Sequence, residues 1–395
     1  MGAHDGNRDI HVICTTVFLD PTLLHAPSDS AIFAAHLAKL AGTAPPSRLS
    51  EKYRKHDIDL IGRIIWTRIN SYMRWMVVKC RLCFYPLLFE IYVMKISVCI
   101  CTFRRPDRLA ILLEDLIQQE RIPDEVVVVD NDAAASGRAT IERRQATGAP
   151  FPIVYDIQPQ RGIAITRNRT VALATGEWLA FVDDDERAPP AWLRQLVESA
   201  TRHSAEGVLG PVVPVVPEDA PNWIKKGNFY DFPRMASGEV VPLNRMRFGN
   251  VLLHGEPLRN EPGPFDPAYG LMTGEDGDLL VRLVQKGARI IWCDEAIVYE
   301  PVEPARLSLR WLLQRALSGG QEFARKTLAG RYGRITPMRR ITLFVRALGQ
   351  LLLAAALAAG SWPFGLHRAA PWLTRVFANF GKLTVFWGWH YHEYA

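Results

Sequence analysis

The sequence lacks the dense blocks of Lys and Arg that mark nucleic-acid-binding proteins, although it is basic overall. Its 395 residues contain 47 Lys and Arg against 41 Asp and Glu, a net charge of +6 that is spread thinly along the chain. We therefore exclude a dedicated DNA-binding protein and expect no nucleic-acid partner. With 48% hydrophobic and 22% charged residues, the chain is neither disordered nor fibrous, and it can form one large domain or two ordinary ones.

Cysteine is scarce, and the polar, acidic first residues do not form a secretory signal peptide, so we expect a reducing compartment. Cys80 and Cys83 form one C-x-x-C pair, but the second ligand pair that a zinc site needs does not follow. Packing in the core is the better interpretation of all six thiols. They are Cys14, Cys80, Cys83, Cys99, Cys101 and Cys293.

Glycine-rich phosphate loops are also missing. No G-x-G-x-x-G follows a predicted strand, which excludes a nicotinamide-dependent oxidoreductase. Instead, strand and helix patterns alternate from Met94 onward, which predicts an α/β, Rossmann-like fold with a mixed, mostly parallel sheet covered by helices on both faces. The expected elements are strands at 96–101, 125–129, 153–156 and 178–182, and helices at 109–119, 136–145 and 163–173.

Three regions of the chain differ in composition. Residues 94–330 carry the strand–helix alternation, which begins abruptly at Met94. Residues 1–93 mix polar stretches with an apolar, basic run, and we expect them to be a poorly packed N-terminal extension or an artefact of an upstream start. Residues 331–395 form a hydrophobic tail that is helical by propensity.

Acidic residues follow two of the predicted strands, at the edge of the sheet where ligands bind. Asp130 follows the strand at 125–129, and Asp183, Asp184 and Asp185 follow the strand at 178–182. Like charges packed together raise one another's pKa unless a cation or solvent relieves them. The triplet is either a solvated turn or a D-x-D motif whose hard oxygens hold Mg²⁺ or Mn²⁺.

Five short blocks in order resemble the inverting GT-A glycosyltransferases of family 2, and within them the bacterial exopolysaccharide sugar transferases of the succinoglycan type. The resemblance covers about residues 94–326. Its blocks are Ser97–Pro106, Val129-Asp130-Asn131, Arg161-Gly162 with Arg167-Asn168, Val182–Asp185, and Gly274-Glu275-Asp276.

The resemblance implies a role for each block in binding a nucleotide-sugar donor. Asp130 would hydrogen-bond a uracil-type base, although a strand-end turn explains it too, and either Arg161 or Arg167 could simply be a surface cation. Asp183 and Asp185 would hold the metal ion, with Asp185 the favoured ligand. The implied donor-binding residues are Thr102, Phe103, Arg104, Asp130, Arg161, Arg167, Asp183 and Asp184.

The Glu275-Asp276 pair precedes a predicted helix and has two interpretations. It could be a set of first-turn acids favoured by the helix dipole. The resemblance implies instead that Asp276, with Glu275 beside it, is the general base that takes the proton from the attacking sugar hydroxyl. Asp278 lies about 200° away around a helix and is therefore the better dipole partner.

The sequence departs from the family in two places. Many relatives have a His where this chain has Glu300, which could ligate the metal or have no catalytic part. The Q-x-x-R-W signature of processive synthases is absent, because Leu307-Ser308-Leu309 precedes Arg310-Trp311. Addition of one sugar is therefore expected, not polymerisation.

The hydrophobic C-terminal tail indicates where in the cell the protein acts. Residues 341–366 are apolar apart from Arg346 and Gln350, and are only marginally suited to spanning a bilayer. They could also lie on the membrane or pack on the catalytic region. We expect membrane association, at the cytoplasmic face of the bacterial inner membrane or as a peripherally attached cytoplasmic protein, because lipid-linked acceptors reside there.

The resulting hypothesis is a metal-dependent, inverting enzyme that moves one sugar from a nucleotide-sugar, a UDP-sugar in particular, to a lipid-linked or oligosaccharide acceptor in exopolysaccharide or cell-surface polysaccharide synthesis. A sugar-phosphate nucleotidyltransferase is one alternative, although the loop at 102–106 lacks the glycines it needs. A catalytically degenerate glycan-binding protein is the other, and the intact acidic motifs speak against it.

Overall fold

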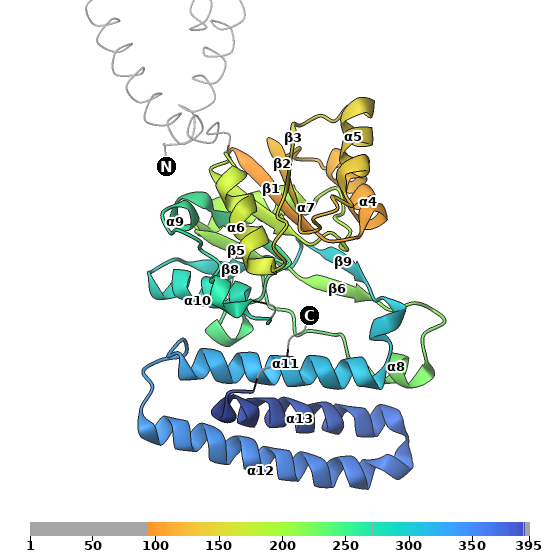
Figure 1. The fold of residues 1–395 in the computed structure, drawn as a ribbon, viewed down its shortest axis with the longest axis vertical. Coiled ribbons are helices and arrows are strands. Elements are labelled where there is room, and N and C mark those ends of the chain that lie inside the picture. The colour runs from red at the N-terminus through yellow and green to blue at the C-terminus, as the bar shows by residue number, and fades with distance from the viewer. Residues whose placement is uncertain (1–93, 271, 390, 392–395) are drawn as a thin grey trace, which may run out of the picture. The chain divides into compact units, whose positions relative to one another are not determined.

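The computed structural model describes residues 94–270, 272–389 and 391 (Figure 1). The predicted extension at residues 1–93 lies outside the described residues, and so do Cys14, Cys80 and Cys83. Of the described thiols, Cys99 and Cys293 are free and buried, as expected, whereas Cys101 is half-buried. Burial raises the pKa of the Cys99 thiol to about 12.

A seven-stranded sheet lies at the centre of this part of the chain, in the order β3-β2-β1-β4-β7-β5-β8. β7 runs antiparallel to β4 and β5, and the other neighbours are parallel, which confirms the mixed, mostly parallel sheet. β6 and β9 form a separate parallel pair. The strands are β1 (Ile96–Thr102), β2 (Glu125–Asp130), β3 (Ile153–Ile157), β4 (Trp178–Val182), β5 (Gly207–Leu209), β6 (Val212–Val215), β7 (Asn250–His254), β8 (Ile290–Trp292) and β9 (Val298–Pro301).

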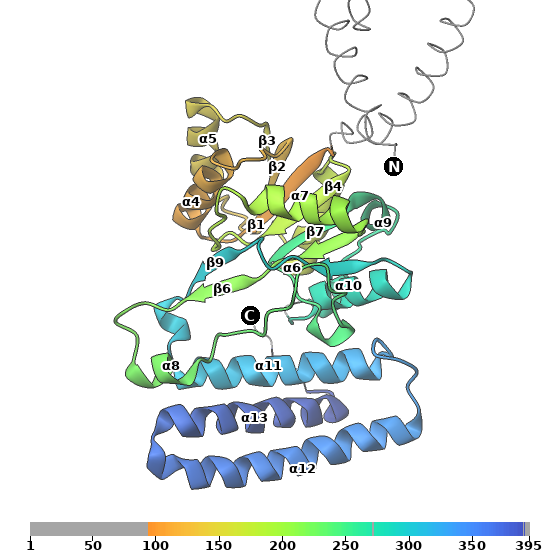
Figure 2. The same cartoon turned by 180° about the vertical axis from the view of Figure 1, so that it is seen from behind.

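Helices cover both faces of the sheet, because successive strand residues point to opposite sides. Ile96, Val98 and Ile100 of β1 pack with α4, α5 and α7, whereas Cys99 packs with α6, α9 and α10 (Figures 1 and 2). These helices are α4 (Pro106–Ile117), α5 (Arg138–Thr147), α6 (Ile163–Leu173), α7 (Trp192–His203), α9 (Gly255–Arg259) and α10 (Glu275–Gln285), and the short α8 (Asn222–Gly227) lies apart from the sheet.

The parallel register brings the predicted acidic residues to one edge. Thr102 at the end of β1 lies opposite Asp130 at the end of β2. β4 pairs with the other side of β1, so its continuation, Asp183, also leaves the sheet at this edge. The predicted bounds of β4 and α6 are confirmed. α4 begins three residues earlier than expected, because Pro106 is suited to the first helical turn.

Three long helices end the described chain, α11 (Leu309–Leu328), α12 (Pro337–Ser361) and α13 (Leu366–Thr384), with α13 between the other two (Figure 1). A Cβ on Gly381 would lie 2.3 Å from the carbonyl oxygen of Leu317, so the α11 and α13 backbones approach closely only because this residue has no side chain. The expected boundary at residue 330 falls between α11 and α12, although α11 packs on the tail. Within the described residues, the segment Pro337–Phe364 is long and apolar enough to cross a membrane.

Candidate functional site

The three consecutive carboxylates after β4 have different surroundings. Asp184 is buried, and its carboxylate accepts hydrogen bonds from Thr102 Oγ1 at 2.8 Å and from Arg105 Nη1 at 3.1 Å. Asp185 is also buried, and its Oδ2 accepts from Arg105 Nη1 at 2.9 Å. Asp183 differs, since 47% of its side chain is exposed. The first carboxylate of the triplet is therefore the one most open to a ligand, and Thr102 serves to hold Asp184.

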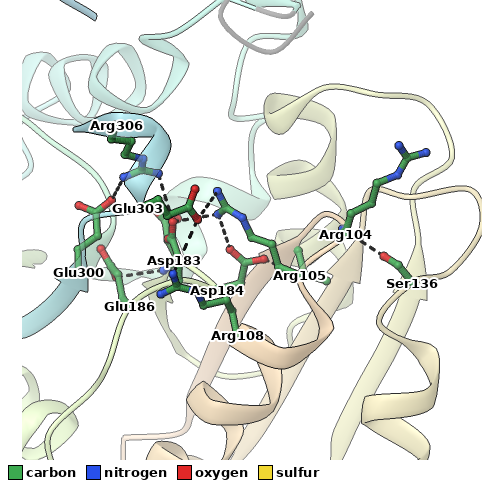
Figure 3. Close-up of polar contacts among 12 residues, drawn as sticks. Arg104, Arg105, Arg108, Ser136, Asp183, Asp184, Glu186, Glu300, Glu303 and Arg306 are labelled. Carbon is green, nitrogen blue, oxygen red and sulfur yellow. Dashed lines mark hydrogen bonds and ion pairs between the residues drawn. The ribbon is translucent and has the colours of Figure 1, made fainter. Parts of the chain in front are cut away.

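Two arginines enter this acidic cluster from distant segments (Figure 3). Arg306 donates to Glu300 of β9 and, from Nη2 at 3.3 Å, to Asp185 Oδ2. Arg105 also lies 3.5 Å from Glu303 Oε1. Glu300 thus lies near the D-x-D residues, as its proposed role requires, but an arginine occupies the space between Glu300 and Asp185.

Negative charge in this region exceeds what these arginines relieve. Burial raises the pKa of Asp184 to about 6, against the attraction of Arg105. Burial and the neighbouring Asp183 raise the pKa of Glu186 well above its usual range. Hard carboxylate oxygens in excess are a suitable donor set for Mg²⁺ or Mn²⁺. In residues 94–270, 272–389 and 391, however, no three acidic, His or Cys side chains are arranged around one point as metal ligands would be.

Arg167 of α6 connects the D-x-D residues to the start of α10. Its guanidinium donates from Nη1 to Glu275 Oε1 at 2.6 Å, and lies 3.5 Å from Asp183 Oδ1 and 3.7 Å from Asp276 Oδ2. The side chain is buried, with its Cζ 4.6 Å from the centre of the Phe248 ring. One cation therefore lies between the predicted metal-binding and catalytic carboxylates, which belong to segments almost a hundred residues apart.

The acids in the first turn of α10 occupy three separate environments. Glu275 is buried, and both burial and the charge of Asp276 raise its pKa, against the attraction of Arg167. Asp276 is 28% exposed and faces Arg167. Asp278, only 1% exposed, binds Arg282 Nε at 3.0 Å and Arg331 Nε at 2.5 Å. The structure thus separates Asp276 from Asp278 in the way the helical spacing predicts.

The residues expected near the nucleotide base form a second group beside the cluster. Phe103 lies beside two guanidinium groups, with Arg104 Cζ 5.0 Å and Arg161 Cζ 4.9 Å from the centre of its ring. Arg104 has a positive φ of 55°, a conformation uncommon for a residue with a side chain, so the backbone turns sharply here. An aromatic ring with cations beside it is suited to stacking on a base and to anionic phosphates.

Asp130 is fully buried, and both of its oxygens accept hydrogen bonds from the protein. Oδ1 accepts from the Asp132 backbone N–H at 2.9 Å, and Oδ2 accepts from the Gly137 N–H at 2.7 Å and the Tyr155 hydroxyl at 3.0 Å. These bonds hold the loop after β2 in place. The base-binding role of Asp130 stays a prediction, and its structural role is the one with contacts in the structure.

Sequence reasoning missed several residues that shape the site. Asn131 belongs to the Val129-Asp130-Asn131 block, but the sequence predicts no role for it. Its Nδ2 donates to the carbonyls of Gln158 and Gln160, and its Oδ1 accepts from the Gly162 N–H. Asn131 therefore positions the loop that carries Arg161. No sequence pattern indicates a role for Arg306, because its partners lie on β9 and after β4 and only folding brings them together.

Comparisons with known proteins identify the family of this chain. The sequence profile described as glycosyl transferase family 2 matches residues 97–251. The chain is 37% identical over 239 residues to the succinoglycan biosynthesis protein ExoM of Rhizobium meliloti, an alignment that covers 59% of this chain and 75% of ExoM. The chain belongs to glycosyl transferase family 2. It is therefore a glycosyltransferase.

Two further comparisons are informative. A glucosyl-dolichyl phosphate glucuronosyltransferase of Haloferax volcanii is 26% identical over 239 residues, which cover 58% of this chain and 75% of that protein. The structure of the mannosyltransferase PcManGT from Pyrobaculum calidifontis, in complex with GDP-Man and Mn²⁺, aligns with a TM-score of 0.52 at 19% identity, covering 76% of this chain and 88% of that one. The fold is the predicted GT-A fold.

Proposed function

We propose that this family 2 enzyme transfers one sugar, with inversion, from a UDP-sugar to a glycan acceptor carried on a lipid, in the synthesis of an exopolysaccharide or another cell-surface polysaccharide. The observation that carries the proposal is the Arg167 contact set, which places the Glu275-Asp276 pair beside the D-x-D residues. The names of the relatives support the pathway and the acceptor, since one belongs to succinoglycan biosynthesis and another acts on a dolichyl phosphate sugar.

On the donor side, Phe103 would stack on the base, and Arg104 and Arg161 beside it would attract the diphosphate. Asp130 would contribute to base recognition, and Thr102 would act through Asp184, whose carboxylate it holds. These assignments place the base near the ends of β1 and β2 and the diphosphate toward the end of β4. This direction agrees with ligand binding beyond the carboxyl ends of parallel strands.

Asp183 and Asp185 would hold Mg²⁺ or Mn²⁺, and Glu300 could add a third oxygen ligand. Such an ion, when bound, neutralises the charge that develops on the leaving diphosphate. Both ion pairs of Asp185 use Oδ2, and Asp183 is half exposed, so the two residues retain donor capacity. Glu300 pairs with Arg306 through Oε1, and its ligation of the same ion as Asp185 would require Arg306, which contacts both acids, to move.

Asp276 would accept the proton of the acceptor hydroxyl while the oxygen forms its bond to the anomeric carbon. The bond between that carbon and the diphosphate oxygen breaks in the same step, and its electron pair leaves with the nucleoside diphosphate, so the configuration inverts. Glu275 would keep Arg167 in place, and Arg167 would keep Asp276 aligned. A carboxylate with partial exposure is suited to meeting an incoming hydroxyl.

The test is a panel of nucleotide-sugars offered to the purified full chain with a lipid-linked oligosaccharide, with and without Mn²⁺. We expect release of nucleoside diphosphate and an acceptor lengthened by one sugar of inverted configuration. Release of pyrophosphate from a nucleoside triphosphate and a sugar 1-phosphate would identify a nucleotidyltransferase instead. Sugar binding without turnover of any donor would identify a degenerate glycan-binding protein.

A further inference from the structure

The outward face of α12 is apolar, which is the reverse of an ordinary surface helix. Its buried residues are small, Ala347, Ala354 and Ala358, whereas five of its large apolar side chains are 40–70% exposed and form one face. Spacings of three and four residues place these side chains on one side of the helix. They are Met338, Ile341, Val345, Leu348 and Leu352. α12 lies at the edge of the described molecule, beyond α13 and away from the sheet (Figures 1 and 2).

Exposed aromatic residues extend this face at its C-terminal end. Trp362 and Phe364, in the short helix that directly follows α12, are 60% and 63% exposed. Aromatic side chains, Trp above all, are favoured where apolar and aqueous phases meet. The face therefore has the composition of a surface that enters an interface, with aliphatic residues along the helix and aromatic residues at one end.

The charges around this face are all of one sign. From residue 323 to residue 392 the sequence has no Asp or Glu and ten Lys or Arg. Arg340, Arg346, Arg368 and Arg375 are exposed. Such a positively charged segment complements an anionic surface. It would also repel a second copy of itself, which argues against a dimer formed through this face.

A groove beside the face gathers part of this positive charge. It has a volume of about 620 Å³ and lies between α11, α12 and α13, with Arg339, Arg346, Gln350 and Lys382 among its lining residues. Lys382 donates to Asn379 Oδ1 at 2.8 Å, and burial together with the nearby Arg346 lowers its pKa. Arg346 follows Val345 on the helix, so the groove opens at the margin of the apolar face.

We propose that α12 lies flat in the headgroup region of an anionic lipid bilayer, with its apolar face in the acyl boundary and the basic margin against lipid phosphates. Amphipathic helices with basic margins bind membranes in this orientation, with their apolar face buried about 5–10 Å. The opposite side of α12 packs on α13, so a spanning position would require the helix to leave its partner. This proposal does not rest on the proposed function, since it concerns binding to lipid and not sugar transfer.

Sedimentation of the full chain with vesicles tests the proposal, using neutral phosphatidylcholine and the same lipid with phosphatidylglycerol. We expect binding to the mixed vesicles that weakens as salt rises, and little binding to the neutral ones. Leu352→Glu should abolish binding, whereas Ile111→Glu, at an exposed apolar position on α4, should not change it. Arg346→Gln and Lys382→Gln should each weaken binding about fivefold, the contribution of one basic residue near an anionic surface.

Three outcomes would overturn the proposal. The first is wild-type protein that binds neutral and anionic vesicles equally well, or that binds neither kind. Another is a Leu352→Glu variant that binds vesicles normally but dissociates a dimer in light scattering, because the face would then join two copies. The third is protein that high salt and alkaline carbonate cannot remove from vesicles, because α12 would then span the bilayer. Thermal melting of each variant checks that the fold is retained, and donor turnover in detergent reports separately on the proposed function.

Discussion

Neighbouring acidic side chains have different surroundings in this protein. Asp276 is partly exposed and faces Arg167, whereas Asp278, two residues later, is buried against two other arginines. Asp183 is open, whereas Asp184 and Asp185 are held in place by arginines. The same residue type therefore has different contacts at neighbouring positions, and each proposed role can be tested by removing one charge.

The first prediction concerns the proposed base. Asp276→Asn keeps the shape of the side chain but removes the proton acceptor, so kcat should fall roughly 10²–10⁴-fold. Donor affinity, measured by calorimetry, should barely change, because the base meets the acceptor. Normal turnover by this variant, with loss of activity in folded Asp278→Asn, would reverse the assignment.

The second prediction concerns Asp278 itself. Asp278→Asn leaves Arg331 without its anionic partner and Arg282 with Glu261 alone. Removing one partner of a buried ion pair costs roughly 3–5 kcal/mol, and we expect the lower end because both arginines are partly exposed. The free energy of unfolding in urea measures this cost. The helix dipole alone would account for at most about 1 kcal/mol, so a loss that small would show that these ion pairs contribute little.

The third prediction concerns the metal. A chelator should abolish transfer, and Mn²⁺ or Mg²⁺ should restore it, because the carboxylates after β4 would supply the oxygen ligands of the proposed metal ion. Asp183→Asn and Asp185→Asn should each raise the Mn²⁺ concentration needed for half-maximal activity. Undiminished turnover in excess chelator would leave the triplet as a structural turn held by Thr102 and Arg105.

At the scale of elements, local rules predict the strand–helix units and the helicity of the tail, but not which face of α12 is buried. The β4 strand and the α6 helix have the bounds that apolar patterning predicts. In α12 the usual reasoning fails, because five large apolar residues on one side of the helix are exposed whereas the residues buried in it are three alanines. Hydrophobic residues along a helix indicate a face that avoids water, but they do not say what covers it.

The fourth prediction tests the close packing of α11 on α13. Gly381→Ala places a methyl group against the Leu317 carbonyl, and it should lower stability by roughly 1–3 kcal/mol, the usual cost of overpacking. Gly349→Ala, in α12 with no neighbouring atom within 4 Å, should be neutral or stabilising because alanine favours the helix. Thermal melting compares the two. Equal effects would mean that the α11–α13 contact tolerates displacement.

At the scale of the whole molecule, the catalytic region and the helical tail are physically linked. Arg331, which follows α11, binds Asp278 at the start of α10, and Thr273 Oγ1 lies 2.8 Å from Ser318 Oγ of α11. The tail therefore supports the helix that carries the proposed base. Docking of α12 on a membrane would hold the acidic strand ends at a set distance from that surface.

The fifth prediction concerns the first 93 residues. β1, which begins at Ile96, is paired on both sides, with β2 and β4, so the described sheet has no unpaired edge at that point. A variant that starts at Met94 should therefore fold and bind the donor as the full chain does, measured by thermal melting and calorimetry with UDP. Insoluble or inactive protein, alongside active full chain, would show that residues 1–93 are integral.

Local pattern determined much of this protein. Side chains alternate along a strand and recur along a helix at fixed spacing, so β1 to β4, the helices α4 to α6 and the parallel pairing of these strands follow from the order of apolar residues. The strand ends meet at one edge by topology, so the acidic motifs could be located without coordinates. Tertiary structure alone decided which charges pair. Arg167 meets Glu275 across 108 positions and Arg306 meets Asp185 across 121, because ion pairs depend on distance in space, which local periodicity does not encode.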